Sequence, residues 1–261
     1  MECIPGRYKK KDLHQLRVRI KRLKSIFFLL EYIYPSNFGA KDYYSLFKPV
    51  FKSAGLMREV QINSDLLKKF VGTDELQKAY NEYIGMIWPG MAEDLERSIA
   101  GFNHSQLDII SSRVEQLLGK HEEAGLVDLI TGFISYETGR ITYLTDDLTK
   151  TEYIHDIRIM LKNIKPLLLL VYPVSYSVFS EAHYRQLNDT ETSIGKWHDL
   201  QVLSVSLSLF SDAVENKNSG ISQEYGSLNK KLETKKRKAF NMAQKSIAET
   251  LLFFNQGPSA V

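Results

Sequence analysis

One row of cationic side chains has the composition and spacing to bind phosphate groups. Arginine presents a planar fork of N–H donors and lysine presents a compact positive charge, so both suit a phosphate oxygen. Residues that recur at alternating steps of three and four share one face of an α-helix. The row with this spacing is Arg7, Lys10, His14, Arg17, Lys21 and Lys24.

The helix that must position this row is predicted to run from about residue 11 to residue 34 and to end at Pro35. A parallel apolar stripe with the same spacing predicts its buried face. Because the cations flank this stripe rather than oppose it, we expect them to line a positively charged groove between helices. The apolar stripe consists of Leu13, Leu16, Ile20, Leu23, Phe27 and Leu30.

The rest of the chain also shows helical periodicity, without period-two alternation or hairpin signals. We therefore predict an all-α fold of long helices with short connections, as in antiparallel bundles. Gly55 is expected to interrupt one helix, Pro89 to kink another, and the polar segment 215–227 to be a mobile loop. The predicted helices beyond the first cover about 41–70, 76–95, 107–118, 124–144, 151–168, 177–214 and 228–254.

An internal repeat organises the chain. The segment 14–24 aligns with 155–165 on the pattern H-x-x-R-[VI]-x-x-K-x-[LI]-K, and 54–61 aligns with 194–201 around a shared glycine. Two motifs that recur in the same order, at nearly the same separation, are unexpected by chance. The sequence therefore predicts two homologous helical halves, residues 1–148 and 149–261.

These paired motifs resemble the CHAD family, the conserved-histidine α-helical domain, over about residues 10–255. The resemblance implies two four-helix bundles related by a pseudo-two-fold axis, with a basic central groove. It also implies a stand-alone protein that binds inorganic polyphosphate. Family members are found alone or fused to a triphosphate-tunnel catalytic domain, whose E-x-E-x-K strand motif is absent from this sequence.

Carried over to matching positions, the resemblance implies a set of polyphosphate-binding residues in both copies. Asn163 stands where the first copy has Arg22, and His198 stands opposite Arg58, so the second copy is less basic. The matched residues are His14, Arg17, Lys21, Arg22, Lys24, Arg58, His155, Arg158, Lys162 and Lys165. Weaker candidates, proposed from charge and position, are Arg7, Lys10, Lys48, Lys52, His198, Lys231, Lys235 and Lys238.

His14 and His155 are expected to tune binding rather than to hold a metal, since neither has a second histidine within four positions. Their protonation beside a polyanion predicts tighter binding at mildly acidic pH. No common catalytic or nucleotide-binding motif is found. We therefore expect a binding protein without cofactor or catalytic residues. Nucleic-acid binding by the same groove, phosphate-chain processing and a purely structural bundle remain open alternatives.

Charge is segregated along the chain. The segments 7–24 and 230–238 carry net charges of +8 and +5, so the remainder carries −10, given the total of +3. Such segregation favours anionic partners. A single cysteine, Cys3, and the absence of an apolar leader or membrane-length segment predict a cytoplasmic protein. The same features predict no membrane partner, and the family resemblance adds an expected association with polyphosphate granules.

Overall fold

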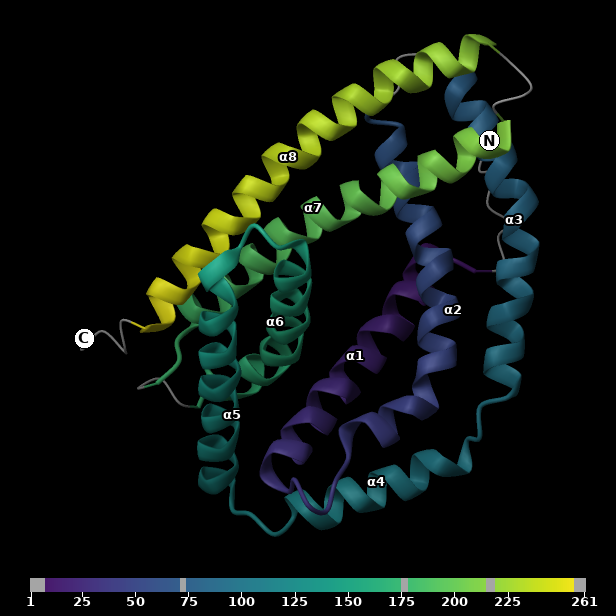
Figure 1. Ribbon diagram of the computed structural model, residues 1–261. Coiled ribbons are helices and arrows are strands. Elements are labelled where there is room, and N and C mark those ends of the chain that lie inside the picture. The colour runs from purple at the N-terminus through teal and green to yellow at the C-terminus, as the bar shows by residue number, and fades with distance from the viewer. Residues whose placement is uncertain (1–7, 71–73, 175–177, 215–218, 256–261) are drawn as a thin grey trace. The chain divides into compact units, whose positions relative to one another are not determined.

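A computed structural model describes residues 8–70, 74–174, 178–214 and 219–255. The all-α prediction is confirmed across these ranges, which contain helices and no β-strand (Figure 1). No helix in these ranges is long and apolar enough to cross a bilayer. The elements are α1 (Lys10–Ile33), α2 (Ala40–Leu67), α3 (Asp74–Ala100), α4 (Ser105–Leu118), α5 (Glu123–Leu144), the 3₁₀ helix η1 (Thr145–Asp147), α6 (Thr151–Val171), α7 (Glu181–Val214) and α8 (Ser219–Asn255).

The chain divides into two compact units, and each contains segments from both predicted sequence halves. The boundary between units falls inside α1, α2, α7 and α8, so these helices contribute to both. The halves 1–148 and 149–261 remain a prediction about the repeat. Unit 1 comprises Met1–Val18, Pro49–Gly101 and Gly195–Asn241; unit 2 comprises Arg19–Lys48, Phe102–Ile194 and Met242–Val261.

Two predicted interruptions are wrong. Helix α2 continues through Gly55, and α8 already begins at Ser219, inside the segment 215–227 that was expected to be a loop. A single glycine costs a helix only about 1 kcal/mol relative to alanine. Long helices tolerate such a cost, because most of their stability comes from packing of an apolar face.

The apolar stripe predicted for α1 is confirmed. Leu13, Ile20, Phe27 and Leu30 are each no more than 4% exposed, while Leu16 and Leu23 are half-buried. In unit 2, an aromatic cluster surrounds the Phe27 ring, whose centroid lies 5.9, 5.9 and 6.1 Å from those of three other rings. The three partner rings, from the connection after α1 and from α2, belong to Phe38, Tyr43 and Phe47.

In unit 1, Tyr80 joins α3 to α7. The ring is fully buried and meets Phe210 edge-on, with 5.5 Å between centroids. The hydroxyl lies 2.7 Å from Ser206 Oγ, so the buried polar group has a hydrogen-bond partner. This contact contributes both apolar burial and a specific orientation of the two helices.

Glu137 of α5 is a carboxylate held almost completely out of water, at 4% exposure. Its Oε1 accepts a hydrogen bond from Arg140 Nη1 at 2.7 Å. Its Oε2 is buried without a hydrogen-bond partner among the described residues. Burial raises the pKa of Glu137 above the ordinary value, and the bond and charge of Arg140 offset only part of that rise.

Stability should therefore depend on pH through Glu137. A raised carboxyl pKa means that the folded state binds the proton more tightly than the unfolded state, so this contribution to stability is lost as pH rises through the raised pKa. We expect Glu137→Gln to gain stability relative to the wild type between about pH 4.5 and about pH 7.5, by urea unfolding. The control is Glu93→Gln at an exposed position of α3. Its difference in unfolding free energy from the wild type should not change over this pH range. A flat difference for Glu137→Gln as well would contradict the expectation.

Candidate basic site on α1 and α6

The basic row of α1 lies at the edge of the buried stripe, as its spacing predicts. Among its described members three are half-buried, while Lys10 and His14 are exposed. Arg22, a further candidate next to the row, is exposed as well. Arg7 lies outside the described residues. Half-buried lysine and arginine side chains generally pack their apolar stems against the protein and keep their charged ends near water or polar groups. The three half-buried members of the row are Arg17, Lys21 and Lys24.

In unit 1, Arg17 joins α1 to α2. Its Nη1 donates a hydrogen bond to the carbonyl oxygen of Phe51 at 2.6 Å. Its guanidinium carbon also lies 4.1 Å from the centroid of the Phe51 ring, within the range of a cation–π contact. A Cβ at Gly55 would collide with Nη1 and lie 3.1 Å from Cζ. The glycine of the repeat motif thus leaves room for the arginine of the first motif.

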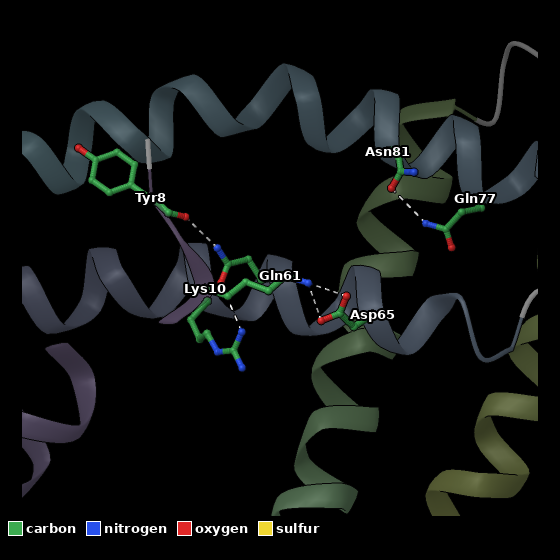
Figure 2. Close-up of polar contacts among 7 residues, drawn as sticks. Tyr8, Lys10, Gln61, Asp65, Gln77 and Asn81 are labelled. Carbon is green, nitrogen blue, oxygen red and sulfur yellow. Dashed lines mark hydrogen bonds and ion pairs between the residues drawn. The ribbon is translucent and has the colours of Figure 1, made fainter. Parts of the chain in front are cut away.

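A second set of contacts joins the beginning of α1 to α2 (Figure 2). Lys10 Nζ lies 2.7 and 2.8 Å from the two carboxylate oxygens of Asp65. Gln61 Nε2 donates to the carbonyl oxygen of Tyr8 at 3.3 Å, and Gln61 Oε1 accepts from Arg58 Nη1 at 3.3 Å. The positive charge of Lys10 is therefore balanced within the protein, while that of Arg58 faces a neutral amide.

In unit 2, the two helices that carry the H-x-x-R motif lie side by side. Ser25, which is completely buried, places its Oγ 3.1 Å from the carbonyl oxygen of Lys21 and 3.3 Å from that of Lys162. The first contact is within α1 and the second reaches α6. Lys21 and Lys162 occupy equivalent positions in the two sequence motifs. A small side chain at the contact permits this close approach of the two helix backbones, at the positions of the two aligned lysines.

The next equivalent pair, Lys24 and Lys165, has unequal surroundings. Lys165 Nζ lies 2.6 Å from Glu191 Oε2 and 2.8 Å from Asn188 Oδ1, so its charge is neutralised. Burial lowers the pKa of Lys24. No described carboxylate forms an ion pair with Lys24. Its charge is therefore available to an external anion.

Aromatic rings surround the Lys24 ammonium. Its Nζ lies 5.4 Å from the centroid of the Phe28 ring and 5.0 Å from that of Tyr44. These contacts compensate for part of the lost hydration, because a ring face attracts a cation. They also hold the ammonium in one orientation, which suits phosphate binding.

The two copies also differ at the position after Lys21 and Lys162. Arg22 is exposed, whereas Asn163 is 6% exposed. A buried position would impose a large desolvation penalty on an arginine without a partner. The structure thus gives a physical reason for the lower positive charge of the second copy.

The remaining candidates of the second copy lie on α6 and α7. His155 is exposed, Arg158 and Lys162 are half-buried, and all three belong to unit 2. His198 is half-buried on α7 in unit 1. The predicted groove thus has candidates on both units, and it remains a prediction, while the α1–α6 contact lies within unit 2 alone.

The weaker candidates differ in exposure: Lys10 is exposed, His198 is half-buried, and Arg7 lies outside the described residues. Lys48 and Lys52 of α2 and three lysines of α8 are exposed. Sequence reasoning missed Lys68 and Lys69, which are also exposed and follow the last residue of α2. Only their positive charge could have suggested them, because the sequence contains no pattern that links them to α8. The three α8 residues are Lys231, Lys235 and Lys238.

The described ranges contain no candidate metal site, because no three His, Cys, Asp or Glu side chains lie close enough together to hold a metal ion. The comparisons with known proteins add no further assignment. No family model matches the chain, and no curated protein matches it. The side-chain geometry of α1 and α6 therefore carries the functional argument.

Proposed function

We propose that this protein binds inorganic polyphosphate through the basic face of α1, where α1 lies beside α6. The observation that supports it is the Ser25 contact, in which one hydroxyl meets the backbone carbonyls of Lys21 and Lys162, the lysines at matching positions of the two motifs. The Lys24 ammonium, without a carboxylate among the described residues and partly desolvated, supports the same proposal. The proposal includes membership in the CHAD family, which the resemblance of the paired motifs implies.

Polyphosphate suits such a surface because it is a flexible chain of phosphates without bases to read or stack. Its receptor needs cations in a row, at intervals that a helix supplies. Binding releases counterions, so affinity should fall steeply with salt, as it does for nucleic acids. The proposal requires binding only and assigns no catalytic residue.

Removal of three cations from the α1 face tests the proposal. We expect Lys21→Gln/Arg22→Gln/Lys24→Gln to weaken binding of long-chain polyphosphate by more than about tenfold. By analogy with single-stranded nucleic acids, the slope of log affinity against log salt should fall by about 2 for three lost phosphate contacts. Fluorescence anisotropy over a salt series measures both quantities. Arg17 is left intact because it holds α1 to α2.

The matched control removes the same charge from exposed lysines on other elements, as Lys41→Gln/Lys78→Gln/Lys120→Gln. Its affinity should stay within about twofold of wild type, with an unchanged salt slope. Equal weakening of both variants would contradict the α1 site. Circular dichroism shows whether each variant is folded.

Two further measurements separate the alternatives. RNA or DNA that displaces polyphosphate at equal charge concentration would favour a nucleic-acid-binding protein. Phosphate release from polyphosphate in the presence of Mg²⁺ or Mn²⁺ would favour an enzyme. Stable polyphosphate binding without either result is the outcome we expect.

A further inference from the structure

The end of α2 and the first half of α8 carry exposed lysines that the α1–α6 site does not use. Lys235 Nζ lies 4.7 Å from the centroid of the Phe70 ring, which brings α8 against the segment that ends α2. Two segments far apart in sequence therefore supply one surface within unit 1. Its five lysines are Lys68, Lys69, Lys231, Lys235 and Lys238.

The carboxylates nearest in sequence to these five lysines already form ion pairs with other lysines. Glu233, the one acid in the basic segment 230–238, lies 2.5 Å from Lys236. Asp65, one helical turn before Lys68 and Lys69, holds Lys10. None of the five lysines forms an ion pair with a described carboxylate. The surface thus carries positive charge without compensation, which concentrates anions near it.

This surface continues the basic row of α1. Lys10 is the first described residue of that row, and its ion pair with Asp65 places it beside the last turn of α2 (Figure 2). Lys69 lies four residues after Asp65, which is about 6 Å along a helix. Within unit 1, lysines therefore occur at the beginning of α1, just after α2 and, through the Lys235–Phe70 contact, on α8.

We infer that these five lysines form a second polyanion-contact surface, which binds further phosphate groups of a long polyphosphate chain. The inference rests on the proposed function and extends it, since it adds a surface in unit 1 to the α1–α6 site in unit 2. A long chain offers many phosphate groups, so each surface should add its own contacts to the affinity for long chains. Lysine suits this role because its mobile ammonium follows a flexible ligand.

Replacement of the α8 lysines tests the inference on the full-length protein with long-chain inorganic polyphosphate as the probe. We expect Lys231→Gln/Lys235→Gln/Lys238→Gln to lower the affinity about tenfold and the salt slope by about 2. The control is again Lys41→Gln/Lys78→Gln/Lys120→Gln, with the same change in net charge. Lys68→Gln/Lys69→Gln is a second variant on the α2 side, for which the slope should fall by about 1.

The outcomes distinguish this inference from the proposed function. If wild type binds and the α1 variant weakens binding, but the α8 and α2 variants match the control, the second surface is refuted and the proposed function stands. If wild type fails to bind polyphosphate, both are refuted. A loss of affinity and slope in the α8 and α2 variants beyond that of the control supports the second surface. Because Lys235 contacts Phe70, an α8 variant that does not fold leaves the decision to the α2 variant.

Discussion

Replacing Phe27 by alanine should lower the free energy of unfolding by about 4 kcal/mol, since removal of a buried phenylalanine ring usually costs about 3–5 kcal/mol. The side chain is completely buried at the centre of the aromatic cluster in unit 2. Its three ring neighbours come from the segment after α1 and from α2, so the surrounding structure has little freedom to collapse into the space. Urea unfolding followed by circular dichroism measures the effect.

The adjacent residue supplies the control for Phe27. Phe28 is the same residue type on the same helix, but it is half-buried beside Lys24. Phe28→Ala should cost about 1 kcal/mol, because less apolar area is removed from contact. Equal losses for the two variants would show that the Phe27 cluster is not the main packing site of α1.

Two equivalent glycines should respond to alanine with opposite signs. At Gly195 in α7, a Cβ would meet nothing within 4 Å, so alanine should stabilise the helix by up to about 1 kcal/mol. At Gly55, a Cβ would displace the Arg17 guanidinium from the Phe51 carbonyl. The lost hydrogen bond to a charged group is worth about 1.5–3 kcal/mol. It exceeds the gain in helix propensity, so Gly55→Ala should destabilise by about 1–2 kcal/mol.

A double-mutant cycle isolates the cause at Gly55. In an Arg17→Ala background the collision is gone, so Gly55→Ala should there stabilise α2 by up to about 1 kcal/mol, as Gly195→Ala does in α7. Urea unfolding of the four proteins gives the coupling. If Gly55→Ala destabilises equally with and without the arginine, contact with Arg17 is not the reason for glycine at this position.

The contacts of Arg17 bear on the proposed function because they give this residue a positioning role. The guanidinium holds α1 on α2 through the Phe51 carbonyl and ring. The first motif thus contains residues of two kinds, one that fastens the helix and others, such as Arg22 and Lys24, whose charge has no described carboxylate partner. A binding assay on Arg17 variants alone would combine the loss of a positive charge with the loss of the α1–α2 contact.

The sequence predicted local features well. Helical periodicity correctly gave an all-α fold and the buried side of α1, because burial of one face imposes a repeat of 3.6 residues. It was wrong about Gly55, since the local preference of glycine for breaks was outweighed by the long packed helix. The repeat aligned Lys24 with Lys165. It could not predict that only Lys165 forms an ion pair, because the groups around each lysine are distant in sequence.

By itself, the sequence determined the all-α class, the apolar face of α1 and the spacing of the cations, because these follow from interactions within one or two turns. Only the tertiary structure decided which cations bind groups within the protein itself. Arg17 meets Phe51, Lys10 meets Asp65 and Lys165 meets Glu191. It also decided that Lys235 reaches Phe70. The physical reason is that charge compensation depends on distance in space, and packing of helices brings together side chains that no local pattern relates.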